Sequence, residues 1–291
     1  MVKQPTGSWR LGVLVVLVLA VSVWAAGPMP PPPGSTPASL SLWYDKPTRA
    51  FEEALPLGNG RLGAMVFGDI ASERVMLNDA TLWAGGPVEP RVNPDAITYL
   101  PRVREALFKE DYRLADELTR KLQGRYSQSY APLGDLYIDA PVAPAGPTSA
   151  FRRQLDIGSA TARTAFTTGL AEYAREYFVS YPDRVLVIRL TASEPGALTF
   201  TLRADSQLHR TVQVDSSGDL LLIGRAPVHA EPNYRRDIKE PLVYDDGPDG
   251  KGMRFAARIR VLATDGRVTR ESASVSVSQA REALVVVAVE T

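Results

Sequence analysis

The stretch from Phe151 to Ala192, "FRRQLDIGSATARTAFTTGLAEYAREYFVSYPDRVLVIRLTA", decides the fold class of this chain. It contains four strand-like runs, at 151–157, 161–166, 171–179 and 185–192, and Gly and Asp residues lie at the breaks between them. Short runs rich in β-branched and aromatic residues, bounded by turn formers, are typical of β-strands. The stretch therefore predicts consecutive strands joined by short turns.

Similar runs continue on both sides of this stretch. The sequence predicts further strands at 61–69, 73–77, 133–138, 197–203, 207–214, 220–224, 253–264, 268–277 and 283–290. The 22 Gly and 23 Pro residues are spread along the chain, which fits many turns. Many short strands with regular turns are typical of a large antiparallel sandwich, so we expect a mainly all-β fold.

A short helical insertion interrupts the strand pattern between residues 93 and 124. Asn93 offers an N-cap and Pro94 occupies a first helical position. Because proline breaks a running helix, we expect Pro101 to begin a second helix, and Gly124 to end the helical run. We expect these helices to serve structural packing.

The N-terminus has the layout of a signal peptide. Lys3 and Arg10 precede an apolar run at 11–23, and small residues follow at Ala25 and Ala26. The run is short for a membrane span, which takes about 20 residues, although an uncleaved anchor is the alternative. We expect a signal peptide at 1–25, a Pro-rich linker at 26–40 and a folded domain at 41–291. The mature chain would then be secreted or periplasmic, without a membrane attachment.

Composition excludes several classes of function. Lys plus Arg and Asp plus Glu both total 33, so the formal net charge is zero and a nucleic-acid partner is disfavoured. The chain has no cysteine, which excludes disulfides, thiolate metal sites and cysteine nucleophiles. The acidic loop around Asp245 and Asp249 lacks the spacing of an EF-hand, and a solvated turn is the favoured interpretation. We expect no metal and no cofactor.

Four segments resemble one known family when they are taken in order. They are "LPLGNGRLGAMVFG" at 55–68, "VMLNDATLWAGGP" at 75–87, the helical region leading into "YAPLGDLYID" at 100–139, and "RAPVHAEPNY" with "VYDDGPDGKGMRFAARIRV" at 225–261. In this order they resemble the N-terminal domain of family 95 glycoside hydrolases, which include α-L-fucosidases. The resemblance covers nearly the whole chain after the linker.

The resemblance implies a large β-super-sandwich joined to an (α/α)₆ barrel. In the family the general acid and the Asn-assisted base lie in that barrel, so no catalytic residue is carried over to this chain. We expect the chain to stop before the barrel and to be inactive alone. Its implied glycan partner is a fucosylated or related glycan, which it would meet through the barrel, and a companion chain could carry that barrel. The alternatives are a free-standing carbohydrate-binding module and a gene fragment.

Four residues are candidates for positions near the substrate. Trp83 could stack on a sugar while Asn78 binds its hydroxyl groups, or Trp83 could anchor the core with its indole N–H paired. His229 and Tyr234 lie in an expected loop that could face the barrel mouth, or His229 could be a hydrogen-bonded turn residue. For Trp83 the core interpretation is favoured, because large aromatic side chains mostly bury their area in cores. For His229 both interpretations stay open.

The Gly-Asn-Gly sequence at 58–60 has a simpler interpretation. A phosphate-binding loop would need a following Lys-Ser/Thr pair and a helix, whereas strand-like residues follow here. Gly58 and Gly60 therefore predict a sharp chain reversal.

Overall fold

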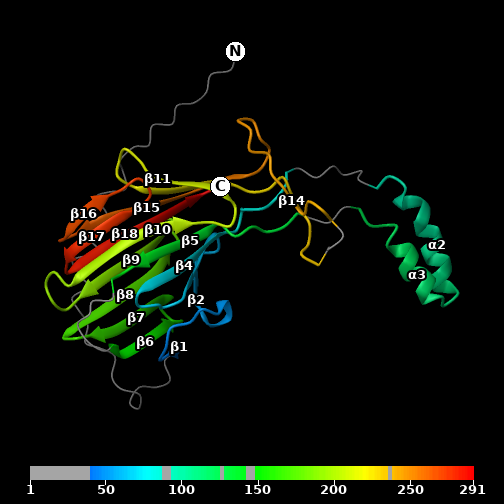
Figure 1. Ribbon diagram of the computed structural model, residues 1–291. Coiled ribbons are helices and arrows are strands. Elements are labelled where there is room, and N and C mark those ends of the chain that lie inside the picture. The colour runs from blue at the N-terminus through cyan, green and yellow to red at the C-terminus, as the bar shows by residue number, and fades with distance from the viewer. Residues whose placement is uncertain (1–39, 87–92, 125–127, 142–147, 235–237) are drawn as a thin grey trace. The chain divides into compact units, whose positions relative to one another are not determined.

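The computed structural model describes residues 40–86, 93–124, 128–141, 148–234 and 238–291 (Figure 1). The predicted signal peptide and nearly all of the predicted linker lie outside the described residues. Leu40–Thr291 forms one compact unit, and it is built mainly from antiparallel strands.

The larger sheet has nine strands, all paired antiparallel. Their order across the sheet is β1 (Ser41–Tyr44), β6 (Thr148–Asp156), β7 (Thr161–Thr168), β8 (Ala171–Ser180), β9 (Val185–Ala192), β18 (Glu282–Glu290), β15 (Arg254–Thr264), β12 (Leu220–Arg225) and β11 (His209–Val214). Sequential strands pair from β6 to β9, as the strand-rich stretch predicted.

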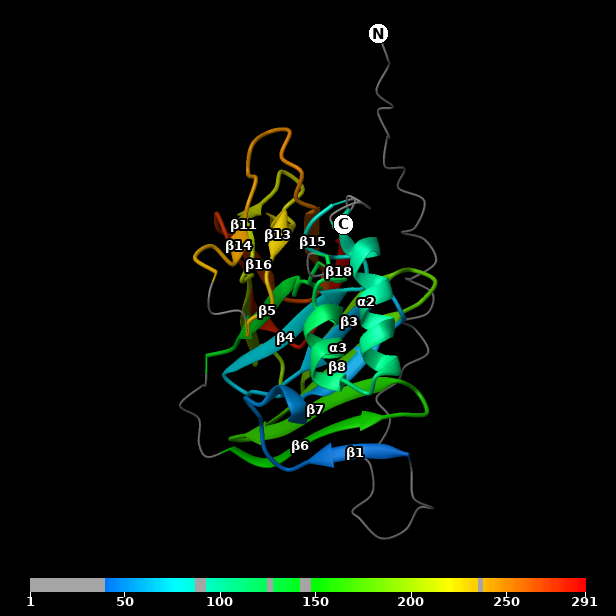
Figure 2. The ribbon, with the colours of Figure 1, turned by 90° about the vertical axis from the view of Figure 1, so that its right-hand side faces the viewer.

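The second sheet has seven strands and packs against the first. Its order is β16 (Arg267–Arg270), β17 (Val275–Ala280), β10 (Leu198–Asp205), β5 (Gly134–Asp139), β4 (Ser72–Asp79), β3 (Leu62–Val66) and β2 (Leu55–Gly58). A two-stranded ribbon pairs β13 (His229–Ala230) with β14 (Leu242–Val243). Figure 2 shows the strands of the sandwich from a second side.

The core lies between the two sheets, and alternation of side chains builds it. Along β18, Ala283, Val285 and Val287 are fully buried, and the residues between them are only partly buried. The same alternation in β4 buries Val75 and Leu77. Successive residues of a strand point to opposite faces of the sheet, so one buried face produces this pattern. The predicted all-β antiparallel super-sandwich is confirmed.

Strand β18 carries an uncharged apolar run, "ALVVVAV", and it lies inside the larger sheet. It pairs with β9 on one side and with β15 on the other. Its backbone groups are therefore satisfied on both sides, and the run does not form an exposed edge. The strands at the edges of the larger sheet are β1 and β11.

The Gly-Asn-Gly sequence forms the hairpin between β2 and β3. The Asn59 side chain accepts hydrogen bonds from the backbone N–H groups of Arg61 and Leu62, at 3.0 and 2.8 Å. Gly60 has φ +90°, a left-handed conformation that glycine adopts without steric cost. The predicted chain reversal is confirmed.

The helical insertion differs from the prediction at Pro101. Helix α2 (Ala96–Phe108) runs through Pro101, and the second helix, α3 (Tyr112–Thr119), begins only after Asp111 caps it. Proline at this position removes one backbone hydrogen bond, but Val103 and Ala106 of α2 pack on α3 and hold the helix together. Among the described helices, none is long and apolar enough to cross a membrane.

The strand predicted at 268–277 is two strands. A turn at 271–274 separates β16 from β17, and the Glu271 N–H donates to the Ser274 carbonyl at 2.9 Å. The Ser274 hydroxyl also donates to the Glu271 carboxylate, at 3.1 Å. These local bonds stabilise a hairpin in a polar stretch, where the hydrophobic pattern gives no clear boundary.

Candidate functional site

Residues 82–85 and 128–131 form a short antiparallel bridge beside the smaller sheet. Trp83 pairs with Tyr130, the Ala84 N–H donates to the Ser129 carbonyl at 2.8 Å, and the Ala131 N–H donates to the Leu82 carbonyl at 3.1 Å. Alternate residues of such a bridge share a face. Leu82 and Ala84 face the core and are buried, so Trp83 faces outward.

Two sets of three side chains lie on this bridge and its neighbours, each set linked by its own hydrogen bonds or ring contacts, and we call the six together the Trp83 surface. They are Asn78, Trp83, Gln128, Tyr130, His229 and Glu231. Three of the four candidates from the sequence, Asn78, Trp83 and His229, belong to this surface. Tyr234 lies farther along the chain, exposed in the turn after β13.

Trp83 and Tyr130 form an aromatic pair that is only half-buried. Their ring centroids are 5.3 Å apart in an edge-to-face arrangement, and the side chains are 45% and 42% exposed. The Trp83 indole N–H donates to the Ala80 carbonyl at 3.1 Å. Trp83 is therefore not a core anchor, although its N–H is paired as that interpretation required.

The Tyr130 hydroxyl group is also bound to protein atoms. It donates to Asn78 Oδ1 and lies 3.0 Å from the carbonyl oxygen of Asp79. Burial raises the pKa of the Tyr130 phenol, which keeps the hydroxyl protonated as a donor. Asn78 is thus a partner of Tyr130, and the contact fixes the ring.

His229 lies between Gln128 and Glu231. Its Nε2 is 2.9 Å from Glu231 Oε1, and its Nδ1 is 3.4 Å from Gln128 Nε2. Gln128 Oε1 and Glu231 Oε2 are buried acceptors without a hydrogen-bond partner within the described part of the chain. A buried acceptor without a donor is costly, so this group has unused capacity to accept hydrogen bonds.

Gly85 allows Gln128 to lie across the bridge. It has φ +83°, and a Cβ at this position would clash with the Gln128 side chain. The Gly85 N–H also donates to the Pro227 carbonyl at 2.8 Å, which ties the bridge to the segment that carries His229. The sequence "WAGGP" therefore permits a close approach that a larger residue would prevent.

An ion pair between the partly exposed Arg61 and the buried Asp79 lies next to the Trp83 surface. Asp79 is 1% exposed, and its carboxylate lies 3.2 Å from Arg61 Nε. Arg61 also contacts Glu290 at 3.2 Å, and the Thr81 hydroxyl lies 2.5 Å from that of Thr291. The last residues of the chain therefore lie beside this surface. Figure 1 likewise places the C-terminus and β14 at one end of the sheets.

Sequence reasoning missed Gln128, Tyr130 and Glu231. Tyr130 begins the "YAPLGDLYID" segment, which carried part of the family resemblance. That segment was the available signal, but only the backbone pairing places it opposite Trp83.

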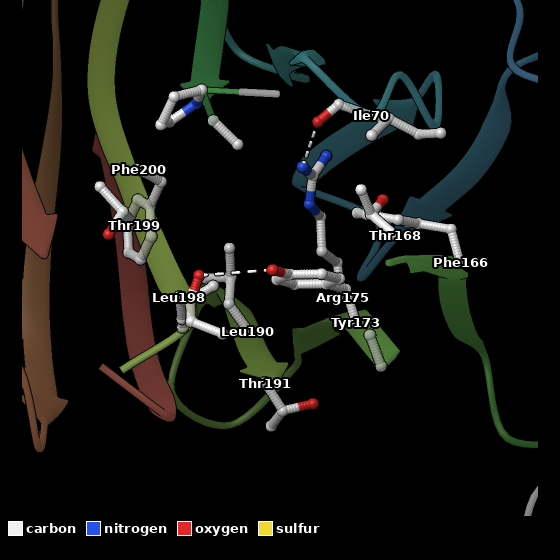
Figure 3. Close-up of a pocket in the computed structure, with 14 residues that line it drawn as sticks. Ile70, Phe166, Thr168, Tyr173, Arg175, Leu190, Thr191, Leu198, Thr199 and Phe200 are labelled. Atoms are coloured by element: carbon white, nitrogen blue, oxygen red, sulfur yellow. Dashed lines mark hydrogen bonds between the residues drawn. The ribbon is translucent and has the colours of Figure 1, made fainter. Parts of the chain in front are cut away.

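A second feature is a cavity of about 270 Å³ that lies between the sheets (Figure 3). Its apolar wall includes Phe166, Leu190 and Phe200. Arg175 lies at its edge, and its guanidinium donates to the carbonyls of Asp69 and Ile70, both at 2.6 Å. The guanidinium of Arg175 therefore donates its hydrogen bonds to backbone carbonyls, and the wall of the cavity is mainly apolar.

Next to this cavity, Glu73 is a fully buried carboxylate. It accepts hydrogen bonds from the N–H groups of Phe67 and Gly68, at 3.2 and 2.7 Å, and from the Tyr177 hydroxyl at 3.1 Å. Arg175 lies 3.6 Å away. Burial raises the pKa of Glu73 to about 6, because lost hydration outweighs these favourable contacts.

Neither feature has the arrangement needed to cleave a glycosidic bond. Cleavage uses two carboxyl groups that flank the bond, whereas Asp79 is buried in an ion pair and Glu73 lies inside the sandwich. Within the described residues, no group of three or more His, Cys, Asp and Glu side chains is arranged to hold a metal ion.

Comparison with known proteins identifies the relatives of this chain. The family described as "Glycosyl hydrolase family 65, N-terminal domain" matches residues 42–291. "Alpha-L-fucosidase 2" of Arabidopsis thaliana is 32% identical over 231 residues, which cover 78% of this chain and 27% of that protein. "Probable alpha-fucosidase A" of Aspergillus niger is 38% identical over 175 residues, which cover 57% of this chain and 22% of that protein.

The chain thus spans about a quarter of the length of these curated relatives. The resemblance to a glycoside hydrolase N-terminal domain, first indicated by the four segments, is confirmed. The chain belongs to the glycosyl hydrolase family 65 N-terminal domain family, and its homologues are glycoside hydrolases named as alpha-fucosidases.

Proposed function

We propose that this chain is the N-terminal domain of an exported α-L-fucosidase-like hydrolase, and that it packs on a catalytic (α/α)₆ barrel and shapes its entrance. The observation that carries the proposal is the match over 231 residues to an alpha-L-fucosidase that is much longer than the matched region. The remaining length of such a protein has room for a separate catalytic domain. Fucosylated or related glycans are the substrates that this relationship suggests.

The position of the last residues supports the proposed orientation. Thr291 lies against Thr81, two residues from Trp83. A polypeptide that continued from Thr291 would leave the sandwich beside the Trp83 surface. This end of the sheets is therefore the one that we assign to the barrel.

The role of the chain in this proposal is structural and positioning, since the carboxylate of the Trp83 surface and the one next to it each have a cationic or imidazole side-chain partner. Asp79 is paired with Arg61, and Glu231 with His229. The chain alone should release no fucose. The barrel would supply the general acid and base, either in the same protein or in a companion chain.

The test combines an activity assay with a binding assay. The purified chain is incubated with 2′-fucosyllactose, alone and after co-expression with the Arabidopsis alpha-L-fucosidase 2 from which the matched 231 residues have been removed. We expect no fucose from the chain alone, and co-purification with fucose release when both are present. Fucose release by the chain alone that survives repurification would contradict the proposal, as would failure of the two polypeptides to associate.

A free-standing carbohydrate-binding module is the second candidate, because the half-exposed rings of Trp83 and Tyr130 could contact a sugar without a barrel. Glycan binding by the chain, together with no association and no fucose release in the co-expression, would favour it.

A further inference from the structure

We propose that the cavity between the sheets binds one small, uncharged aromatic molecule that carries a hydroxyl group (Figure 3). This cavity is separate from the Trp83 surface, because the two lie at opposite ends of β4. Ile70, which precedes the strand, lines the cavity, whereas Trp83 follows the strand. The inference therefore goes beyond the proposed function and does not depend on it.

The cavity is open to solvent and has room for one ring. Its lining includes the exposed Pro141 and the partly buried Ala140 and Ala197, so a ligand can reach it from this side. Its volume is about 270 Å³. An engineered apolar cavity of about 150 Å³ stays dry and binds benzene. The larger volume here therefore accommodates a benzene ring with small substituents.

The wall of the cavity favours an aromatic ligand. Phe166 and Tyr173 are stacked, with their ring centroids 5.2 Å apart and their planes inclined by 14°. Leu190, Leu198 and Phe200 supply further apolar surface. A flat ring can pack on the stacked pair in an offset or edge-to-face arrangement, and its burial removes apolar surface from water.

The cavity offers no free charge to a ligand. Among the described residues that line it, Arg175 alone is charged. Its guanidinium donates to the carbonyls of Asp69 and Ile70, and it lies 3.6 Å from the carboxylate of Glu73. A carboxylate or ammonium ligand would lose its hydration here without gaining a free partner of opposite charge. The ligand that fits is therefore uncharged.

One hydroxyl group in the lining lacks a partner. Thr168 is buried and lines the cavity, and its side chain makes no hydrogen bond within the described residues. The hydroxyl of Tyr173, by contrast, lies 3.4 Å from the Ala197 carbonyl and is paired. Buried water is held well only by about two to four polar partners. A phenol brings apolar surface and one hydroxyl group that can pair with Thr168, so it fits better than water or a plain hydrocarbon.

The experiment titrates the full chain at neutral pH with p-cresol, toluene and 4-methylbenzoate, and it follows leucine methyl signals by NMR. Leu198 reports on the cavity, and Leu82, buried next to Trp83 at the other end of β4, is the control signal. Thr168→Val removes the hydroxyl group and keeps the shape of the side chain. Thr167→Val is the matched control variant, because Thr167 lies on the same strand and points to the opposite face. A thermal melt confirms that each variant folds.

We expect p-cresol and toluene to shift the Leu198 signals and to leave the Leu82 signals in place. The affinity for p-cresol should be about fivefold higher than for toluene, which is the effect of one net hydrogen bond. Thr168→Val should remove this preference, Thr167→Val should keep it, and 4-methylbenzoate should not bind. If Thr168→Val fails to fold, the methyl shifts and the ranking of the three compounds in the unaltered chain still decide.

Equal shifts at Leu198 and Leu82, or no shift with p-cresol and toluene at their solubility limits, would overturn the site. Binding of 4-methylbenzoate in preference to the other two compounds would show that the ligand is an anion held by Arg175. Unaltered affinity for p-cresol in Thr168→Val would overturn the role of the hydroxyl group. None of these results bears on barrel packing, which association and fucose release in the co-expression measure separately.

Discussion

Replacing the buried carboxylate of Glu73 with an amide should change how the stability of this domain depends on pH. Glu73 lies between the sheets, and burial raises its pKa from 4.5 to about 6. One pH unit corresponds to about 1.36 kcal/mol of differential protonation free energy. Ionising Glu73 therefore costs about 2 kcal/mol more in the folded protein than in the unfolded chain.

The sign follows from proton binding. The folded state holds the Glu73 proton more tightly than the unfolded state, so the stabilising contribution is fully present below pH 4.5. It is lost as the pH rises through about 6. Glu73→Gln cannot ionise, and the amide oxygen can still accept from Phe67 and Gly68. Relative to the variant, the native chain should lose about 2 kcal/mol of unfolding free energy between pH 4.5 and 7.5.

The assay is urea unfolding followed by circular dichroism at several pH values across this range. Glu176→Gln is the matched control. Glu176 lies on β8 between Arg175 and Tyr177, which contact Glu73, but it points to the opposite face of that strand, near Arg163 and Arg189. The control should keep the pH dependence of the native chain. The reasoning would be refuted if the free energy of unfolding depended on pH in the same way for Glu73→Gln and the native chain. It would also be refuted if the native chain gained stability relative to the variant as the pH rises.

Three further predictions concern packing, export and association. Gly85→Ala should lower the unfolding free energy by about 1–3 kcal/mol, because of its left-handed φ and the clash with Gln128. Gly86→Ala, with no atom within 4 Å of its added Cβ, should cost far less in the same thermal melts. Intact mass of the exported protein should place the mature N-terminus near Ala26, and a retained Met1 would contradict cleavage. Light scattering across a dilution series should show self-association of the chain alone, since the end assigned to the barrel faces water; a monodisperse monomer at high concentration would argue against that assignment.

Local sequence predicted most of the strands because their signals are local. The run 185–192 was predicted with the bounds that β9 has in the structure. A β-branched run needs only its own residues to favour an extended backbone. Prediction failed where local and tertiary preferences compete. Pro101 predicted a helix boundary, but packing of α2 on α3 carries the helix through it.

The candidate site was predicted in part. Asn78, Trp83 and His229 were chosen for their chemistry, and the structure brings them into one surface. Their exposure could not be predicted, since a tryptophan after a strand can face either the core or the solvent. Tyr130 was missed because it is 47 residues from Trp83, and it carries no local signal that specifies this pairing.

The sequence by itself determined the fold class, the hairpin at Asn59 and the family resemblance, because each of these depends on residues that are close together along the chain. Only the tertiary structure decided which segments meet. It placed β18 between β9 and β15, buried the carboxylate of Glu73 between the sheets, and turned the rings of Trp83 and Tyr130 outward. The physical reason is that strand order and side-chain exposure depend on packing between distant segments, and that packing is not encoded in the pattern of any one strand.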